Sequence, residues 1–495
     1  MYLPKKIIDS VNSIGQIYEV GGVVRDRIRY ALSLDTGRID PKKFWSFPPE
    51  EVDYLVTGMP MNALTSELKQ FGHVELVGKS FGVIKFKLEI QNPKSKIYDI
   101  ALPRRETSTG LGHRDFEIEF DPDLPVEQDL GRRDFTVNAI ALRIQKPVLR
   151  LALSNAEGMT SLPNGRMDSK FNIQNSELID PYNGLQDIKD RLIRMVNPQA
   201  FKEDPLRMLR ACQFAARFQF SIEQDTFKAI KKNANLIRTV SPERVQQELN
   251  KMLLKADQPS IGLWLMQRSG LLKEVFPELE EGVDVTQPGG YHRYKVFEHS
   301  IKSVDFAPKI LEMRLAALLH DIAKPRCREV FQGGAHFYGH DKLGEKIAKE
   351  LLERLKYSGE IISRVALLVR RHMFAFPETE KGLRRLIAKV GINVMYDLIE
   401  LRRADIRAQG RGTEEADRDL DLFEQAITEV INKNPPFTIN DLQLDGVIVM
   451  AEFHLKPGPE VGRVLRHLLD YVLDHPEKNK RDLLLDEAAR WLGTG

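Results

Sequence analysis

Cysteine is scarce in this sequence, with only Cys212 and Cys327 among 495 residues. Two cysteines cannot build a disulfide framework, which excludes the small disulfide-rich secreted proteins and favours a reducing compartment such as the cytoplasm. Uncharged apolar runs are also missing, because none approaches the roughly 18 residues of a membrane-spanning helix. The N-terminus shows no signal-peptide pattern, since Asp9 and Ser10 interrupt its apolar residues. We therefore expect an intracellular protein without a membrane partner.

An excess of either charge is absent as well. The chain has 73 Lys and Arg against 71 Asp and Glu, so its net charge is +2. This balance neither favours nor excludes a nucleic-acid partner, and any basic surface must be local. Hydrophobic residues make up 42% of the chain, a globular value that excludes a disordered protein. At about 150 residues per domain, the length predicts about three domains.

Short apolar runs bounded by glycine or proline predict strands in the N-terminal part, at 14–20, 52–58, 73–78, 82–90 and 97–102. With a helix predicted at 23–32, this part is expected to be an α/β head with a mixed sheet. The polar turn residues of 150–179 predict an irregular insertion. Farther on, apolar residues at helical spacing predict a long all-α body with helices at 203–218, 242–255, 258–272, 295–305, 310–323, 343–356, 359–371, 382–408, 413–432 and 460–474.

A glycine pair, Gly21-Gly22, lies between a predicted strand and a predicted helix and is followed by Arg25 and Asp26. Adjacent glycines let backbone N–H groups approach a phosphate, and the N-terminus of a helix favours an anion. The residues therefore suit a phosphate-binding turn, although an ordinary tight turn would look the same.

Two carboxylates, Glu51 and Asp53, open the next predicted strand, where alternate residues project to the same face. Such a pair could hold divalent cations that bridge a triphosphate and an attacking hydroxyl, or it could be a charged strand edge. The later group Arg133, Asp134 and Asn138 has the donors and acceptors of a ribose and phosphate site, or else begins a helix.

In this order, the motifs resemble the bacterial-type tRNA nucleotidyltransferases, which are the CCA-adding enzymes and their relatives, the bacterial poly(A) polymerases. The resemblance rests on GGVVRD (21–26), EVD (51–53), RRDFTVNA (132–139), DPYNG (180–184) and EDPLRMLR (203–210), and extends through SPERV (241–245) to KPGPEVG (456–462). GKSFGVIKF (78–86) is more similar to the CCA-adding branch, and RRETSTGLGHRDF (104–116) resembles the loop used for adding the final A. Glu51 departs from the family, which usually has aspartate there.

The resemblance implies a site in the head. Glu51 and Asp53 would be the catalytic carboxylates and hold Mg²⁺, and Asp99 is either a third carboxylate or a solvated strand residue. The triphosphate would be positioned by Gly21, Gly22, Arg25 and Asp26, and ribose and phosphate contacts would come from Arg133, Asp134 and Asn138. The nucleotide-selecting segment would comprise Glu203, Asp204 and Arg207, with Arg210 on the same predicted helix.

Base choice has a chemical rationale in Asp204 and Arg207, which are three residues apart and would share a helix face. Aspartate accepts hydrogen bonds and arginine donates them. Cytosine and adenine both offer an amino donor beside a ring acceptor, whereas uracil and guanine reverse that pattern. The pair could therefore select C and A without a template, or it could be an ordinary surface ion pair.

A second cluster lies in the helical body and comprises His299, His320, Asp321, His340, His372 and Asp405. The adjacent His320-Asp321 follows the apolar run 315–319 and is expected on a mostly buried helix, where metal binding would offset the cost of a buried carboxylate. Separate core histidines are the alternative. The order H…HD…H…H…D resembles the HD metal-dependent phosphohydrolase domain, which is fused to one branch of the CCA-adding enzymes. That resemblance implies a divalent metal of undetermined identity and, as substrates, 2′,3′-cyclic phosphates, 2′-nucleotides or phosphate ends.

The sequence thus predicts template-independent addition or repair of the 3′-terminal CCA of tRNA from CTP and ATP, with a second, phosphohydrolase activity. A poly(A) polymerase and an HD phosphohydrolase whose head only binds RNA stay open as alternatives. No obligate protein partner is inferred. The predicted domains are a head at 1–145, an insertion and linker at 146–180, a nucleotide-selecting and RNA-binding region at 181–285, an HD domain at 286–410 and a helical tRNA-binding tail at 411–495.

Overall fold

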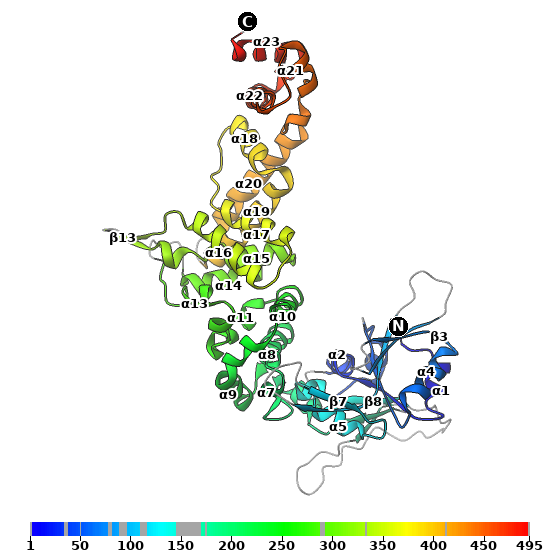
Figure 1. The fold of residues 1–495 in the computed structure, drawn as a ribbon. Helices are drawn as coiled ribbons and strands as arrows, with labels where there is room; N and C mark the ends of the chain where they lie inside the picture. Colours follow the sequence, from blue (N-terminus) through cyan, green and yellow to red (C-terminus); the bar gives the residue numbers. More distant parts are fainter. Residues whose placement is uncertain are drawn as a thin grey trace. The chain divides into compact units, whose positions relative to one another are not determined.

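The computed structural model describes residues 2–33, 38–49, 51–77, 82–88, 97–108, 116–144, 170–173, 176–287, 293–331, 334–410 and 413–493. The chain divides into two compact units, Met1–Asp257 with Ile261–Val275, and Gln258–Ser260 with Phe276–Gly495. Figure 1 shows the strands of the first unit in blue and cyan and the helices of the second from green to red. None of the helices in these described ranges is long and apolar enough to cross a membrane.

The first unit is built on a mixed eight-stranded sheet of order β3-β4-β5-β2-β1-β8-β10-β9. Only β2 and β5 pair in parallel among its neighbouring strands, and the other pairs are antiparallel. The strands are β1 (Gln16–Val20), β2 (Asp53–Thr57), β3 (Gly72–Val77), β4 (Val83–Leu88), β5 (Ile97–Ala101), β8 (Ala141–Ile144), β9 (Lys170–Ile173) and β10 (Ser176–Ile179). The separate hairpin β6 (Arg104–Ser108) and β7 (Phe116–Phe120) follows β5. The predicted α/β head is confirmed.

Helices complete the first unit, and buried apolar residues attach them to the sheet. Tyr18 and Val20 of β1 and Leu55 of β2 pack with Val126 and Leu130, which belong to one helix. The helices are α1 (Lys5–Val11), α2 (Gly22–Ala31), α3 (Pro41–Ser46), α4 (Met61–Lys69), α5 (Val126–Gly131), α6 (Gly184–Lys189), α7 (Ala200–Glu203), α8 (Leu206–Phe218), α9 (Gln224–Asn233), α10 (Pro242–Lys255), α11 (Pro259–Ser269) and α12 (Leu271–Val275). Residues 16 to 20 therefore present a buried face to α5 and end at the glycine turn.

The segment around α3 encloses a buried ion pair. Arg27 of α2 is fully buried, and its guanidinium lies 2.6 Å from the Glu19 carboxylate of β1. The Arg27 guanidinium carbon lies 5.2 Å from the Phe44 ring centroid, 5.1 Å from that of Trp45 and 4.8 Å from that of Tyr2. Burial raises the pKa of Glu19, although Arg27 opposes the rise. The aromatic residues of α3 thus cover a charged pair that joins α2 to the sheet.

The variant Glu19→Ala is expected to lower the free energy of unfolding by about 3–5 kcal/mol, because Arg27 would stay buried without its partner. Urea unfolding followed by tryptophan fluorescence measures this, since Trp45 lies against Arg27. The double variant Glu19→Ala/Arg27→Met should lose less stability, because neither charge is left buried. A single variant as stable as the wild type would show that the pair adds nothing.

The second unit is helical in its described part, apart from the short hairpin β13 (Glu329–Phe331) and β14 (Gly334–His336). Near the C-terminus a separate core forms around Val449, Leu468 and Leu484. The helices are α13 (Pro277–Glu280), α14 (Val296–Phe306), α15 (Leu311–Leu319), α16 (His340–Arg354), α17 (Gly359–Arg371), α18 (Glu380–Val390), α19 (Ile392–Ala408), α20 (Thr413–Asn432), α21 (Gly446–Glu452), α22 (Pro459–Asp474) and α23 (Arg481–Leu492). The predicted helical body is confirmed.

The structure differs from the predicted elements in three places, and the first two differences have local causes. The helix predicted at 382–408 is two helices, because Gly391 takes a φ of +87° between α18 and α19. The helix predicted at 258–272 likewise ends at Gly270, which has a φ of +82°. The irregular insertion predicted for 150–179 is wrong at its end, where β9 and β10 extend the sheet beside β8, and its earlier part lies outside the described residues.

Candidate functional site

Two carboxylates lie side by side where β2 and β5 run parallel. Asp53 opens β2 and is the register partner of Asp99 on β5, while on its other side Asp53 pairs with Val20, the last residue of β1. Both carboxylates are exposed, as is Glu51 just before β2. Asp99 thus joins the predicted pair, because strand pairing brings a residue 46 positions away next to Asp53. Three exposed acidic side chains of this kind offer the oxygen ligands that Mg²⁺ prefers.

The pKa of Asp53 is consistent with a site that several carboxylates share. The pKa of its carboxyl is raised, first by partial desolvation and then by the neighbouring charges of Asp99 and Glu51, while Arg133 opposes the rise. Carboxylates that repel one another in this way are stabilised by a bound cation. The donor set therefore fits a divalent metal.

The glycine turn directly precedes this group. Gly21 follows β1 with a φ of +74°, and a Cβ added to it would lie 2.6 Å from an Nη atom of Arg133. A side chain at this position is therefore excluded twice, by backbone conformation and by the arginine. Gly22 begins α2, so the free N–H groups of that helix lie at the same end of β1 as Asp53.

A continuous chain of hydrogen bonds connects five of the predicted nucleotide-binding residues. Arg25 donates through Nε to Asp26 at 2.8 Å and through Nη1 to the Asn138 side chain. Asn138 in turn donates to Asp134 at 2.9 Å, and the other Asp134 oxygen accepts from Arg210 at 2.8 Å. Burial opposes the ionisation of Asp134, but Arg210 and Asn138 outweigh it and lower the pKa of the carboxyl. The glycine turn, the 133–138 segment and α8 therefore share one polar network.

The segment predicted to select the nucleotide, residues 203–210, is not the single helix that the sequence predicted. α7 ends at Glu203 and α8 begins at Leu206, and between them Asp204 is extended with φ −138° and ψ 99°. The reason is Pro205, which disfavours helical backbone at the residue before it. Asp204 and Arg207 thus do not share the face of one continuous helix.

The partners of these two side chains also differ from a mutual ion pair. The Asp204 carboxylate accepts from Arg244 at 2.9 Å and 3.3 Å. Arg207 donates to Glu203 at 3.1 Å and to the backbone carbonyl of Arg132 at 2.7 Å. Sequence reasoning gave Arg244 no role, although it belongs to the SPERV motif, and that motif was the available indication.

The second cluster is assembled from five helices of the second unit. Its six members come from α14, from the residues directly after α15, from the start of α16, from the residue after α17, and from α19. Each is buried, with an exposed fraction between 0 and 8%. The residues are His299, His320, Asp321, His340, His372 and Asp405. α15 ends at Leu319, so His320 and Asp321 lie in the turn after the predicted helix rather than within it.

Asp321 divides the cluster into two groups of potential ligands. Its Oδ2 atom lies 3.2 Å from His320 Nε2 and 3.6 Å from His299 Nε2. Its Oδ1 atom lies 3.6 Å from His340 Nε2 and 3.8 Å from His372 Nε2. Asp405 completes the first group, with Oδ1 3.0 Å from His299 Nε2. One carboxylate thus contributes a different oxygen to each group.

Backbone carbonyls orient the histidine rings toward the centre. The Nδ1 atoms of His320, His340 and His372 lie 2.7–2.8 Å from the carbonyls of Ala317, Phe337 and Val369, each three residues earlier. A ring that donates from Nδ1 presents its Nε2 lone pair to the cluster, which is the tautomer a metal needs. His299 uses the carbonyl of Ala408 at 3.4 Å.

The charges of the cluster also fit a metal centre. Burial, helped by His320, lowers the pKa of His372 to about 3, so its ring is neutral at physiological pH. Burial opposes the ionisation of Asp321, but His320 and Lys324 outweigh it and hold the pKa of the carboxyl well below its usual range. Burial opposes the protonation of His320, but Asp321 outweighs it and raises the pKa of His320. A divalent ion between these side chains would take the place of that proton, and imidazole with carboxylate is a donor set that suits a first-row ion.

Lys324 is a functional candidate that sequence reasoning missed. Its ammonium nitrogen lies 2.7 Å from Asp321 Oδ2 and donates to Gln287 at 2.7 Å. Its place three residues after Asp321, in the turn that follows a buried helix, was the only available indication. A cation at this position would bind the phosphate of a substrate held at the cluster.

The family model described as "Poly A polymerase head domain" matches residues 17–168, "Probable RNA and SrmB- binding site of polymerase A" matches 219–282, and "HD domain" matches 296–422. An A-adding tRNA nucleotidyltransferase of Deinococcus radiodurans is 34% identical over 359 residues, which cover 70% of this chain and 75% of that protein. The chain belongs to the tRNA nucleotidyltransferase family.

Other members of the family differ in the nucleotides they add. A CC-adding tRNA nucleotidyltransferase of Thermus thermophilus is 33% identical over 360 residues, 70% of this chain and 73% of that protein. The crystal structure of the CCA-adding enzyme of Bacillus stearothermophilus in complex with CTP has a TM-score of 0.65 and 20% identity, and covers 99% of this chain and 98% of that one. The fold is therefore that of a CCA-adding enzyme, and this chain is a tRNA nucleotidyltransferase with an HD domain.

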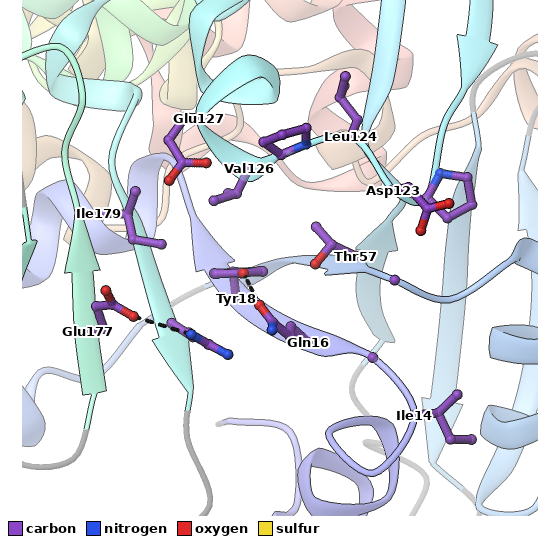
Figure 2. A pocket seen from close by; sticks show the side chains of 15 residues that line it. Ile14, Gln16, Tyr18, Thr57, Asp123, Leu124, Val126, Glu127, Glu177 and Ile179 are labelled. Atoms are coloured by element: carbon purple, nitrogen blue, oxygen red, sulfur yellow. Dashed lines mark hydrogen bonds and ion pairs between the residues drawn. The ribbon is translucent and has the colours of Figure 1, made fainter.

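The head also holds a cavity of about 430 Å³ that is separate from these groups (Figure 2). It is lined by Gln16 and Tyr18 of β1, by the 122–127 segment and by Arg143 and Glu177, which form a 3.4 Å hydrogen bond. Gln16 begins β1, whereas the glycine turn follows its last residue. The cavity thus lies at the other end of β1 from Asp53.

Proposed function

We propose that the head adds C and A nucleotides to the 3′ end of tRNA without a template, and that Asp53, Asp99 and Glu51 are its metal-binding carboxylates. The pairing of Asp53 with Asp99 beside the glycine turn carries this proposal, because it puts a cation site next to a phosphate-binding turn. The 3′ hydroxyl of the RNA would attack the α-phosphate of the nucleotide, and pyrophosphate would leave. Magnesium at the carboxylates would neutralise the charge that develops on the phosphate oxygens.

The residues around the turn would bind the nucleotide. The backbone N–H of Gly22 and the N-terminus of α2 would bind the triphosphate, with Arg25 and Asp26 shaping that wall. Gly21 would allow the close approach, since its own N–H donates to the Ile140 carbonyl at 3.2 Å. Arg133 lies against Gly21, and its charge opposes the rise in the pKa of Asp53, so Arg133 is close enough to both to contact the same phosphates. Asn138 and Asp134, fixed by Arg25 and Arg210, would contact the ribose.

Base selection would still use Asp204, from the extended link between α7 and α8, and Arg207, from the first turn of α8. Arg207 donates to a carbonyl and Glu203, and Asp204 accepts from Arg244, so each has a partner of the type that C or A would offer. A bound cytosine or adenine would replace Arg244 as the partner of Asp204, and would replace the acceptors that Arg207 now contacts. Uracil or guanine would instead place a carbonyl oxygen against the Asp204 carboxylate, where two acceptors repel each other.

Replacing Arg207 by alanine is therefore expected to relax base choice. UTP and GTP should be added at rates within about tenfold of CTP, since one correct donor is worth about 1–3 kcal/mol of discrimination. The assay is single-nucleotide extension of a tRNA lacking its CCA, with Lys202→Ala, on an exposed residue of α7, as the matched control. Equal loss of CTP and ATP use without misincorporation would instead indicate a phosphate contact.

The nucleotides added can be identified with two acceptors, a tRNA that ends at position 73 and one that ends in CC. Addition of CCA to the first acceptor is the expected result, because the 104–116 segment resembles the loop used for adding the final A. The two ends of this segment belong to the hairpin β6–β7. Extension by C only, or by A only on the second acceptor, would indicate a CC-adding or an A-adding enzyme. A long tail made from ATP alone would indicate a poly(A) polymerase. A tRNA substrate also favours a cytoplasmic location.

We further propose that the HD domain hydrolyses phosphate esters at RNA 3′ ends and at nucleotides, using two divalent ions. The two ligand groups joined by Asp321 support this, since each has at least three donors and they share a carboxylate. Bound metal would supply an activated water for attack on phosphorus. Lys324 would then bind a phosphate oxygen. Natural substrates of this type are 2′,3′-cyclic phosphates and 2′-nucleotides, which arise on damaged RNA ends.

A further inference from the structure

An exposed pair of aromatic rings lies directly before the metal cluster of the HD domain. The rings of His336, which ends β14, and Tyr338 are stacked, with centroids 5.3 Å apart and planes 3° from parallel. Tyr338 is 71% exposed, the largest exposed fraction among the large apolar and aromatic residues of the described chain. Figure 1 shows β13 of the same hairpin extending away from the helices of the second unit. Packing within this chain therefore does not explain why residue 338 is a tyrosine.

Covalent and hydrogen-bond connections join the ring pair to the metal ligands. Only Gly339 separates Tyr338 from the ligand His340, and the carbonyl of Phe337 accepts from His340 Nδ1 at 2.7 Å. The Lys324 ammonium, which contacts Asp321, lies 5.5 Å from the Phe337 ring centroid. The ring pair is therefore held at a fixed place relative to the cluster.

The backbone at Gly339, between Tyr338 and His340, is open on the side where a side chain would lie. Gly339 has a φ of +75°, and a Cβ added there would meet no atom within 4 Å. A ligand could therefore lie along the backbone between Tyr338 and His340, with a phosphate toward the metal ligands and Lys324. The described residues thus offer three kinds of contact, which are the Lys324 ammonium, the metal ligands and the aromatic surface of His336 and Tyr338.

We propose that the His336–Tyr338 ring pair stacks on the nucleobase of the phosphate ester that is hydrolysed at the HD cluster. A flat, exposed aromatic surface binds any base through its π-face and does not discriminate among bases. This proposal rests on the phosphohydrolase function proposed above and names its substrate class: nucleotides and unpaired RNA 3′ ends rather than phosphate esters without a base. Docking of another protein on the same residues is the other outcome that the test below can give.

The test compares two cyclic phosphates that share a five-membered ring, 2′,3′-cyclic AMP and glycerol 1,2-cyclic phosphate, which has no base. Tyr338→Ala should raise the KM for 2′,3′-cyclic AMP about tenfold and leave hydrolysis of the glycerol ester unchanged. Tyr338→Phe should behave as wild type, because it keeps the ring. Val330→Ala, at a residue of the same hairpin that is 66% exposed, is the matched control.

A binding measurement separates the two proposals. The probe is the phosphonomethyl analogue of 2′-AMP, whose carbon–phosphorus bond is not hydrolysed. Calorimetric titration of manganese-loaded protein with this analogue reports stacking without turnover, and loss of the binding heat in Asp321→Asn assigns the binding to the HD domain. Wild-type protein that hydrolyses neither ester would overturn the phosphohydrolase function, while a tenfold weaker affinity of Tyr338→Ala for the analogue would still support stacking. Equal KM and equal affinity for the analogue in wild type and Tyr338→Ala, or no binding of the analogue by wild type, would overturn the stacking proposal and leave protein docking.

Discussion

Replacing Asp53 by alanine should slow nucleotide addition by about a thousandfold or more, because the variant loses a ligand of the ion that neutralises charge in the transition state. Asp53 is exposed at the first position of β2, so its removal opens no cavity in the core. The thermal unfolding temperature should therefore stay close to that of the wild type. Initial rates of CTP addition to a tRNA lacking its CCA, with Mg²⁺ at saturation, provide the measurement.

A matched control for Asp53 is Glu75→Ala, which removes an exposed carboxylate from β3 of the same sheet. This variant should add CTP at the wild-type rate. Asp99→Ala should be impaired as well, because Asp99 is the cross-strand partner of Asp53. Addition by Asp53→Ala within tenfold of the wild-type rate would show that these carboxylates do not hold the catalytic ion.

Replacing Asp321 by asparagine should abolish hydrolysis of 2′,3′-cyclic nucleotides and remove both metal ions from the HD domain. The reason is that the two Asp321 oxygens face different ligand groups, and asparagine retains only one oxygen. His372→Ala should lose one ion and keep the other, because His372 belongs to one group only. Metal content per chain, determined by elemental analysis on the samples used for the assay, distinguishes the two variants.

The control for the metal content is His475→Ala, at a half-exposed histidine distant in sequence from the cluster. It should bind as much metal as the wild type. A wild-type protein that binds a single ion would contradict the two-ion arrangement, and Asp321→Asn with full metal content would show that Asp321 is not a shared ligand.

The residue types at the two sites were predictable from sequence because short motifs in a fixed order specify them. The arrangement of these residues in space was harder to predict. Asp99 remained an open alternative, since the parallel pairing of β2 with β5 depends on the topology of the whole sheet. The division of the HD cluster into two groups was hidden for the same reason, because it depends on how α14, α16, α17 and α19 pack around Asp321.

Local sequence rules account for some of the corrections. The helix predicted from residue 203 is interrupted because Pro205 forces Asp204 out of helical backbone, and the proline was visible in the sequence. The β9–β10 pairing was not visible, since polar turn residues surround its two four-residue strands and β8, the partner of β10, lies more than 25 positions earlier. Polar composition thus predicted a loop where cross-strand hydrogen bonds form a sheet edge.

Assaying nucleotide addition and cyclic-phosphate hydrolysis on the same preparations of wild type, Asp53→Ala and Asp321→Asn tests most directly whether one chain carries two separate metal-dependent centres. Asp53→Ala should lose addition and keep hydrolysis, and Asp321→Asn should lose hydrolysis and keep addition. The ligands of the two centres belong to different units of the chain. Loss of both activities in either variant, with unfolding unchanged, would contradict separate centres.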